Sequence, residues 1–366
     1  MISSFLLGDW ILDIEYKSKG IMTTDEGPLY QFVNCQLLRD HQLIKDDLWV
    51  RNGKILDPEK LFFDERVTAD IQINCKGNII APGFIDVQIN GAFGIDFSSN
   101  VEDIEGGINK VAKGLLAHGV TSFCPTIITS PDDIYKQVVP KVKRRNGSKD
   151  GAGILGMHLE GPFISKEKKG AHNDKHIKNF GNGFPDVLDT YGVLDDVSIV
   201  TLAPEYPRSD EVISELVKRG IVVSMGHSTA NLTQGEEAAN NGASFITHLF
   251  NAMLPFHHRD PHLLGLLTSK MLPKNRYIYY GLIADGIHTH PAAIRIAHRV
   301  HPDDCGVVKA VEAATLHPAE LLGITDKKGT LDFNTDADFI LIDDQLNVKL
   351  TFINGQVVWS CQDNTT

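Results

Sequence analysis

The sequence predicts an α/β protein built around a (β/α)8-type TIM barrel, with a small β-sandwich domain formed by both ends of the chain. Near-continuous apolar runs of strand length alternate with helical runs, as in parallel strands that are covered on both faces. Polar side chains follow several of these runs, at the end where barrel enzymes carry their active sites. Turn-rich segments near both chain ends predict the sandwich.

The two end segments consist of short strand-like runs separated by turn residues. Asn52-Gly53 is a turn signal in the first, and Asn354-Gly355 between two alternating runs predicts a β-hairpin in the second. We expect residues 30–80 and 325–360 to form one composite domain, with the barrel in residues 81–324. Residues 1–29 are interpreted as an N-terminal extension, because their apolar start lacks the basic segment and cleavage site of a signal peptide.

The barrel region contains seven apolar runs of strand length: IIAPGFIDV, VTSFCPT, GILGMHLE, SIVTLAPE, IVVSMGHS, SFITHLF and YIYYGLIAD. Helical patterns lie between or after them, over residues 101–118, 132–145, 210–219, 232–241 and 291–300. A complete barrel needs an eighth strand. The next helical pattern, VVKAVEAATLHPAELLG, follows residue 306 directly. The sequence therefore predicts a barrel that lacks its eighth strand and is incomplete after Asp304.

Composition excludes some classes of partner. The formal net charge is −12, so no basic face is available in bulk for nucleic acid or an anionic membrane. The five cysteines are scattered and form no CxxC pair, which favours free thiols and a cytoplasmic location. No apolar run reaches the ~18 residues of a transmembrane helix.

Three of the strand-like runs carry side chains that bind zinc. Glu160 ends one run, His227 lies near the end of another, and His248 lies in a third at what the pattern predicts to be mid-strand. Each alone has an ordinary structural explanation, such as a strand-end acid or a hydrogen-bonded loop histidine. Together they give three ligands with room for a water, as in catalytic rather than structural zinc sites. We expect one divalent metal, with zinc the first choice and iron, cobalt and manganese the alternatives.

Several motifs together resemble the N-acetylglucosamine-6-phosphate deacetylase family of the amidohydrolase superfamily. They are APGFIDVQING, HLEGPFIS, KGAH, GHS, ITHLFNAM and ADGIH, and the resemblance runs from about Tyr30 to Trp359. It implies the zinc-dependent hydrolysis of the acetamido group of N-acetylglucosamine 6-phosphate, which gives glucosamine 6-phosphate and acetate.

The resemblance also implies a role for individual residues. Glu160, His227 and His248 hold the metal, while Ala171 and His172 meet the substrate and His172 polarises the acetyl carbonyl. Asn251 and Ala252 contact the sugar phosphate. The residues that complete the phosphate pocket are Arg259, Asp285, Gly286, Ile287 and His288. In the family the arginine comes from a neighbouring subunit, so a homodimer is expected. Its forked guanidinium suits a phosphate.

The first and last strands of the barrel differ from the wider superfamily. Gln88 and Asn90 stand where many amidohydrolases carry His-x-His for a second metal, and amides are poor zinc ligands, so one metal is expected. The family's general base is an Asp that ends the eighth strand, and residues 301–317 contain no such motif. A βα-sized segment of ~30 residues or more is therefore missing between Asp304 and Val308.

Three functions remain open from the sequence. The first is a deacetylase whose activity is impaired because its base is absent. The second is a non-catalytic protein, such as a truncated isoform, that still binds the metal and the sugar phosphate. The third is another amidohydrolase, such as a cyclic-amide hydrolase or a deaminase, which Gln88 and Asn90 disfavour.

Overall fold

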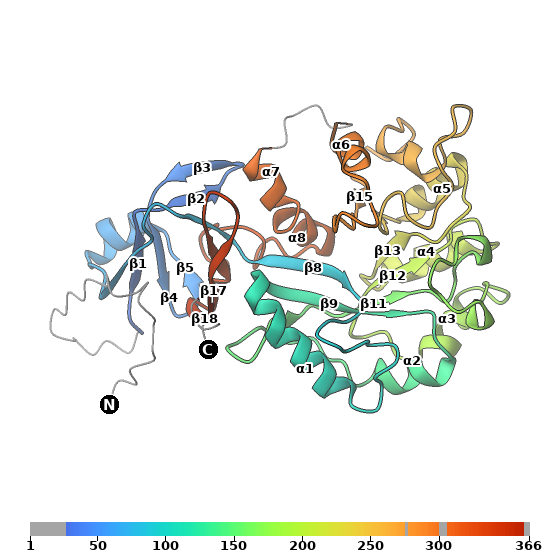
Figure 1. Ribbon diagram of the computed structural model, residues 1–366, viewed down its shortest axis with the longest axis horizontal. Coiled ribbons are helices and arrows are strands. Elements are labelled where there is room, and N and C mark those ends of the chain that lie inside the picture. The colour runs from blue at the N-terminus through green and yellow to red at the C-terminus, as the bar shows by residue number, and fades with distance from the viewer. Residues whose placement is uncertain (1–26, 275–276, 300–305, 362–366) are drawn as a thin grey trace.

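The computed structural model describes residues 27–274, 277–299 and 306–361, and it contains three β-sheets (Figure 1). Most of the predicted extension, residues 1–26, lies outside the described residues, as does Asp304. The division into domains stays a prediction. No helix in the described part of the chain combines the length and apolar character that crossing a bilayer requires.

The largest sheet is parallel throughout and carries the candidate site. Its order is β8-β9-β11-β12-β13-β14-β15, and the short β10 also pairs with β9. The strands are β8 (Phe84–Ile89), β9 (Val120–Ile128), β10 (Gly153–Ile154), β11 (Met157–Glu160), β12 (Val197–Leu202), β13 (Val222–Met225), β14 (Phe245–Ile246) and β15 (Tyr279–Tyr280). Since β10 and β11 both lie beside β9, they occupy one strand position, interrupted at Gly156. Six of the seven predicted apolar runs thus correspond to strand positions of this sheet. The first, IIAPGFIDV, is divided, because Ile79–Pro82 belongs to another sheet and only the part from Phe84 onward forms β8.

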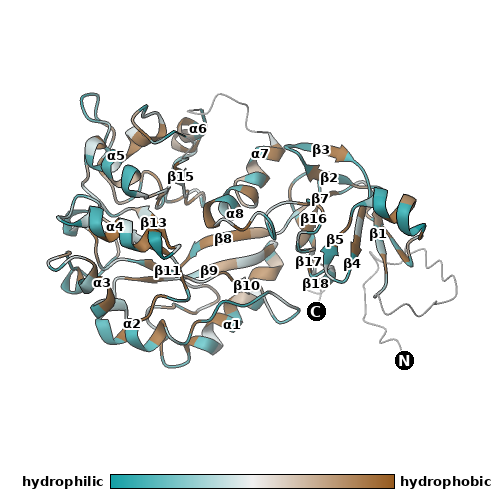
Figure 2. Cartoon of the chain, turned by 180° about the vertical axis from the view of Figure 1, so that it is seen from behind, coloured by the Kyte–Doolittle hydropathy of each residue, from teal (hydrophilic) through white to brown (hydrophobic). Residues whose placement is uncertain are grey.

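Helices cover the outside of the parallel sheet (Figure 1). They are α1 (Ile104–Leu115), α2 (Asp132–Val138), α3 (Phe184–Tyr191), α4 (Ser209–Lys218), α5 (Leu232–Asn241) and α6 (Pro291–Arg299). Short helical turns are η2 (Leu116–His118), η3 (Lys166–Lys168), η4 (Asp174–His176) and η5 (His262–Leu267). Figure 2 shows hydrophobic colouring along β8 and hydrophilic colouring on the outer helix α4. The apolar sides of the helices and strands meet in one large buried cluster.

The prediction that the second helix extends to residue 145 is wrong. Helix α2 ends at Val138, two residues before Pro140. Proline has no amide hydrogen to donate, and its ring clashes with the carbonyl four residues earlier. The helix therefore stops at this proline although the following residues have helical composition.

Segments from both chain ends form two further sheets that share one hydrophobic core (Figure 1). The six-stranded sheet has the order β18-β17-β16-β7-β2-β3, and the four-stranded sheet β5-β4-β1-β6. Phe32 of β1 packs against Phe339 and Phe352 of the other sheet. The strands are β1 (Tyr30–Val33), β2 (Gln36–Arg39), β3 (Gln42–Lys45), β4 (Leu48–Arg51), β5 (Lys54–Ile55), β6 (Ile71–Asn74), β7 (Ile79–Pro82), β16 (Phe339–Ile342), β17 (Val348–Ile353) and β18 (Gln356–Ser360). A π-helical turn, η1 (Lys60–Glu65), lies between β5 and β6.

The helical pattern after residue 306 forms two helices rather than one, α7 (Val307–Glu312) and α8 (Leu316–Leu322). Pro318 explains the break, because proline fits only in the first turn of a helix. The carbonyl of Ala314, four residues before it, is left free and accepts a hydrogen bond from the Ile85 amide at 2.9 Å. This bond ties the α7–α8 junction to the outer edge of β8.

The parallel sheet has two ends, β8 and β15, and no strand in the described residues joins them. Helix α8 lies near both ends (Figure 1), since Leu321 and Leu322 pack with Val87 and Tyr279. The Tyr279 hydroxyl also donates to Glu320. The curved sheet is therefore partly covered by a helix where a closed barrel would carry a strand.

Candidate metal centre

The carboxyl ends of three strands of the parallel sheet, β11, β13 and β14, bring together one carboxylate and two imidazoles. Glu160 is the last residue of β11, while His227 and His248 each lie two residues beyond the ends of β13 and β14. All three side chains are buried, and they form the one group in the described residues whose ligand atoms suit a metal ion. Parallel strands place their carboxyl ends at the same edge, which explains why residues 88 positions apart in sequence meet.

The distances within this cluster fit a single small cation. Glu160 Oε1 lies 3.1 Å from His227 Nε2 and 3.1 Å from His248 Nε2, and the two Nε2 atoms are 3.0 Å apart. Ligand bonds of about 2.0–2.2 Å in tetrahedral directions separate ligand atoms by about 3.3 Å. The three atoms therefore need only a slight expansion to hold zinc, and three protein ligands leave a fourth position open.

A backbone carbonyl fixes the orientation of the His227 ring. The Nδ1 atom of His227 lies 2.8 Å from the carbonyl oxygen of Lys168. A carbonyl only accepts, so Nδ1 carries the hydrogen, and in the neutral ring the Nε2 lone pair faces the cluster. Such a bond is the usual partner of a metal-binding histidine.

Both histidines have left-handed backbone conformations, with φ of 48° at His227 and 31° at His248. The prediction of a mid-strand His248 is wrong, because β14 ends at Ile246 and the chain turns immediately afterwards. Side chains with a β-carbon rarely adopt such φ values, and they occur where surrounding contacts enforce them. The turn directs His248 toward Glu160, which an extended strand would not do.

The electrostatics of the cluster favour an ionised Glu160. Burial would raise the pKa of this carboxyl, but the hydrogen bonds and positive charge that His227 and His248 supply when protonated outweigh burial and hold the pKa well below its usual range. The Asn90 side-chain amide also approaches the second carboxylate oxygen at 3.4 Å. A buried carboxylate that is kept charged attracts a cation.

His172 lies beside the cluster with a defined proton position. Its Nδ1 accepts from the backbone amide of Thr129 at 3.2 Å, so in the neutral ring the hydrogen is on Nε2. That Nε2 lies 3.9 Å from Glu160 Oε1. Burial and the nearby His227 lower the pKa of His172 to about 4, which keeps the ring neutral near pH 7. His172 thus presents an N–H donor to the centre.

The other residues expected beside the substrate are Ala171, Asn251 and Ala252. Ala171 precedes His172 and is exposed. Asn251 approaches the Thr289 hydroxyl at 3.4 Å, and the Ala252 carbonyl accepts from the Ser228 amide at 3.1 Å. Both residues lie on the loop that carries His248, where the Asn251 amide donates to the His248 carbonyl at 2.9 Å.

The residues expected to bind phosphate are exposed in this chain. Arg259 is on a turn between His257 and Asp260. Residues 285–288 form a second exposed turn, in which Asp285 accepts from the Ile287 and His288 amides and pairs with the His288 ring at 2.7 Å. Gly286 has a φ of 75° within this turn. The carboxylate of Asp285 is thus engaged locally.

Sequence reasoning missed two residues that orient site side chains. Thr129, at the end of β9, holds His172, and the Lys168 carbonyl holds His227. Thr129 lies just beyond an apolar strand, and a polar residue at that position is a sequence pattern that predicts a place near the site. A backbone carbonyl carries no such signal, because every residue has one.

The sequence profile of the amidohydrolase family matches the chain in two overlapping stretches, residues 79–305 and 293–358. Two curated relatives are N-acetylglucosamine-6-phosphate deacetylases. The one from Danio rerio is 51% identical over 397 residues, covering 92% of this chain and 98% of the relative. The one from Homo sapiens is 51% identical over 389 residues, covering 90% and 95%.

The alignment with the Danio rerio relative is longer than the chain itself. It spans 397 positions, yet 92% of 366 residues is about 337. The difference, about 60 positions of the relative, has no counterpart in this chain. The two stretches matched by the family profile overlap at residues 293–305, so the profile restarts in the same region in which the sequence lacks a strand.

Solved structures share the fold. The N-acetylglucosamine-6-phosphate deacetylase from Pasteurella multocida superposes with a TM-score of 0.76 at 27% identity, covering 90% of this chain and 99% of that chain. A variant of the Mycobacterium smegmatis protein, solved in complex with N-acetyl-D-glucosamine-6-phosphate, gives a TM-score of 0.71 at 22% identity, with 92% and 100% covered.

Proposed function

Because this chain belongs to the amidohydrolase family and is an enzyme of the N-acetylglucosamine-6-phosphate deacetylase kind, we propose that its metal centre serves that hydrolysis and that turnover is impaired. The products are glucosamine 6-phosphate and acetate. The observation that carries the proposal is the cluster of Glu160, His227 and His248, whose ligand atoms lie 3.0–3.1 Å apart.

Glu160, His227 and His248 are proposed to hold one zinc ion. Two imidazoles and a carboxylate suit zinc, and the neutral amides of Gln88 and Asn90 offer no second site. When bound, the metal activates a water and polarises the acetyl carbonyl. Glu160 supplies the negative charge that offsets the cation, and the Lys168 carbonyl keeps His227 in the tautomer that binds it.

His172 is proposed to donate its Nε2–H to the acetyl oxygen as negative charge develops there. The Thr129 amide supports this role, because its bond to Nδ1 leaves Nε2 as the donor. A donor positioned before the reaction stabilises the transition state more than the ground state. Ala171 is proposed to contact the substrate beside it.

The phosphate is proposed to lie against Asn251, Ala252, Arg259, Asp285, Gly286, Ile287 and His288. Arg259 is exposed and lies on a turn apart from the buried cluster. This placement supports a homodimer in which Arg259 reaches the site of the neighbouring subunit. A bidentate guanidinium would also recruit an anion to a protein whose net charge is −12.

Impaired turnover is proposed because, among the described residues, no strand stands at the position that carries the family's general base. Three observations support this: the parallel sheet has unjoined ends at β8 and β15, about 60 positions of a relative lack a counterpart, and the profile match restarts at residues 293–305. The base takes a proton from the attacking water and returns it to the leaving amine. Asp285, an acid at the end of the seventh apolar run, already pairs with His288 and is not a free replacement for this base.

The proposed function is tested by acetate release from N-acetylglucosamine 6-phosphate in the presence of added zinc. The human relative is assayed in parallel, and Glu160→Gln serves as the metal-site control. We expect turnover ~10²–10⁴-fold below that of the relative, the usual cost of losing a general base. Turnover equal to the relative's would contradict the impairment, and no difference between the chain and its Glu160→Gln variant would show that no residual hydrolysis uses this centre.

A second candidate is a protein that binds the metal and the sugar phosphate without turnover. The buried triad favours it, since all three ligands precede the missing segment. Stoichiometric zinc and a rise in melting temperature with N-acetylglucosamine 6-phosphate, without acetate release, would support binding alone. N-acetylglucosamine is the matched control, because it lacks only the phosphate.

A cytoplasmic location is also proposed. Cys35, Cys75 and Cys124 are buried free thiols, as expected in a reducing compartment.

A further inference from the structure

Glu205 lies just beyond β12, on the strand position between those that carry Glu160 and His227. Its carboxylate accepts three hydrogen bonds from two consecutive residues. Oε2 accepts from the Ser228 hydroxyl at 2.6 Å, and Oε1 accepts from the Thr229 amide at 2.7 Å and the Thr229 hydroxyl at 2.9 Å. Ser228 and Thr229 directly follow His227, so the carboxylate clamps the chain next to a proposed metal ligand.

Ser228 also joins the loops of the two histidines. Its amide donates to the Ala252 carbonyl at 3.1 Å, and it forms a parallel bridge with Met253. Ala252 and Met253 follow His248 on the next strand end. The clamp by Glu205 therefore connects three adjacent loops, and two of them present a histidine to the centre.

The conformation of His227 needs such support. Its φ of 48° is unfavourable for a residue with a β-carbon, so neighbouring contacts must hold it. The Lys168 carbonyl orients the His227 ring, but the bond is to the side chain. The bonds to Glu205 act on the backbone that follows, where a relaxing φ would turn the ring away from Glu160.

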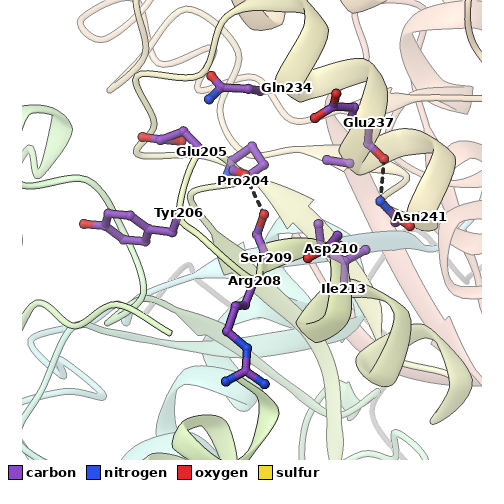
Figure 3. Close-up of a pocket in the computed structure, with 11 residues that line it drawn as sticks. Pro204, Glu205, Tyr206, Arg208, Ser209, Asp210, Ile213, Gln234, Glu237 and Asn241 are labelled. Atoms are coloured by element: carbon purple, nitrogen blue, oxygen red, sulfur yellow. Dashed lines mark hydrogen bonds between the residues drawn. The ribbon is translucent and has the colours of Figure 1, made fainter. Parts of the chain in front are cut away.

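The turn that carries Glu205 is itself fixed. The Ala203 amide donates to the Phe163 carbonyl at 2.9 Å, and the Ser209 hydroxyl donates to the Pro204 carbonyl at 2.6 Å. Figure 3 shows this second bond beside Glu205, at the wall of a pocket of about 310 Å³ that Glu237 of α5 also lines. Glu205 is thus a carboxylate on a rigid support.

We propose that Glu205 is a positioning residue for metal binding, which sets the backbone of the His227 loop through its hydrogen bonds to Ser228 and Thr229. The inference rests on the proposed function, because it assigns a metal to the Glu160, His227 and His248 cluster. Glu205 acts through the geometry of its hydrogen bonds rather than through its negative charge. A glutamine at this position could accept both Thr229 bonds and donate to the Ser228 oxygen, so it should preserve the loop.

Zinc affinity distinguishes the expected effects of substitutions at Glu205 from those of a control substitution. Zinc dissociation constants are measured by competition with a chelator, and the visible spectrum of the cobalt-loaded protein reports ligand geometry. We expect Glu205→Ala to weaken zinc binding by about 10–100-fold and to change the cobalt spectrum, as loss of an outer partner of a metal ligand does. Glu205→Gln should stay within about threefold of the unaltered chain. Glu237→Gln, which removes a carboxylate from the same pocket, should change neither readout.

Two further substitutions keep the test decisive if Glu205→Ala does not fold. Thr229→Val and Ser228→Ala each remove one hydroxyl bond to Glu205, and each should weaken zinc binding several-fold. Unchanged zinc affinity and an unchanged cobalt spectrum in folded Glu205→Ala would overturn the proposal. Equal losses in Glu205→Gln and Glu205→Ala would also overturn it, because charge rather than hydrogen-bond geometry would then be the cause.

Hydrogen exchange of the metal-free protein distinguishes this proposal from the proposed function. Glu205→Ala should speed exchange of the Thr229 amide, while Glu237→Gln should leave it unchanged. An unaltered chain that binds no zinc would refute the metal centre, with the exchange result still reporting on the loop. Exchange that is unchanged in Glu205→Ala would refute the clamp whatever the metal result.

Discussion

The Nε2 atoms of His227 and His248 face each other at 3.0 Å, and both lie 3.1 Å from the same oxygen of Glu160. The Lys168 carbonyl requires the hydrogen of His227 to be on Nδ1. A neutral His227 therefore directs a lone pair toward His248. Either a proton or a metal cation between these atoms relieves the repulsion, and the buried carboxylate favours a cation.

Removing any one ligand should abolish tight zinc binding. Glu160→Gln, His227→Asn and His248→Asn each leave two protein ligands, which is too few for a catalytic zinc site. Zinc content after dialysis, measured by elemental analysis, should fall from about one ion per chain to near zero. His176→Asn, outside the cluster, is the control and should retain the metal. A ligand variant that keeps a full equivalent would count against the site.

Restoring the missing segment should restore turnover. A chimera that carries the human relative's corresponding segment between Asp304 and Val308 should raise acetate release by ~10²–10⁴-fold, the contribution of a positioned general base. Zinc content should be the same with and without the graft. The matched control is the same chimera with its strand-end aspartate changed to asparagine. If that control were as active as the chimera, the base would not be the missing element.

Arg259 should act on the phosphate of a ligand bound by the other subunit. Arg259→Ala should remove the melting-temperature rise given by N-acetylglucosamine 6-phosphate, and Arg259→Lys should restore only part of it, since lysine lacks the fork. Arg66→Ala, at an exposed arginine that directly follows η1, is the control.

Mixed dimers test whether Arg259 acts across the interface. Mixing Arg259→Ala with His248→Asn chains should recover about a quarter of the sites, because half of the dimers are mixed and each holds one intact site. Titration calorimetry counts these sites. No recovery in the mixture would show that Arg259 acts within its own chain or not at all.

Asp86 should make stability depend on pH. Burial raises the pKa of this β8 carboxyl to about 6, so its ionised form is disfavoured in the folded state. The unfolded value is about 3.9. The penalty is therefore absent below about pH 4 and complete above about pH 6, reaching about 2–3 kcal/mol.

Asp86→Asn removes this penalty and still offers an oxygen to the Gln88 amide, which bonds Asp86 at 2.9 Å. Urea unfolding should show the variant to be more stable than the unaltered chain at pH 7.5, with the gain shrinking at pH 4. A gain of equal size at both pH values would refute the role of ionisation.

Lys328 should be needed for the stability of the end-segment sheets. Burial alone would lower the pKa of Lys328, but Asp338 and Asp336 outweigh it and raise the pKa. Lys328→Met leaves two acids without their buried cation and should cost about 3–5 kcal/mol in urea unfolding. Lys328→Met combined with Asp338→Asn should recover part of this loss. A single variant as stable as the unaltered chain would contradict the pairing.

Sequence patterns predicted the regular elements well where local chemistry marks them. The helix predicted over residues 232–241 has those bounds, because Asn231 and Gln234 form a capping box and Gly242 follows its last residue. The apolar runs matched strand positions, since burial on both faces requires apolar side chains. The end of α2 was also predictable from the sequence, because Pro140 does not fit in the interior of a helix.

The geometry of the centre was less predictable. The composition around His248 indicates a longer strand, yet β14 has two residues and the turn at His248 depends on contacts with other strand ends. The bond from His227 to the Lys168 carbonyl joins residues 59 positions apart and involves no distinctive side chain. Such features depend on how strands come together, which a linear pattern does not contain.

The segment after residue 299, where the described residues contain no strand to join β15 to β8, lies downstream of every proposed ligand. Glu160, His227 and His248 occur in one continuous stretch of chain, on strands that pair with their own neighbours. An alteration after residue 299 can therefore remove proton transfer and leave ligand capture intact. In such a chain, binding of the metabolite and its hydrolysis depend on different segments. Hydrolysis can therefore be lost while the residues that bind the metabolite stay unchanged.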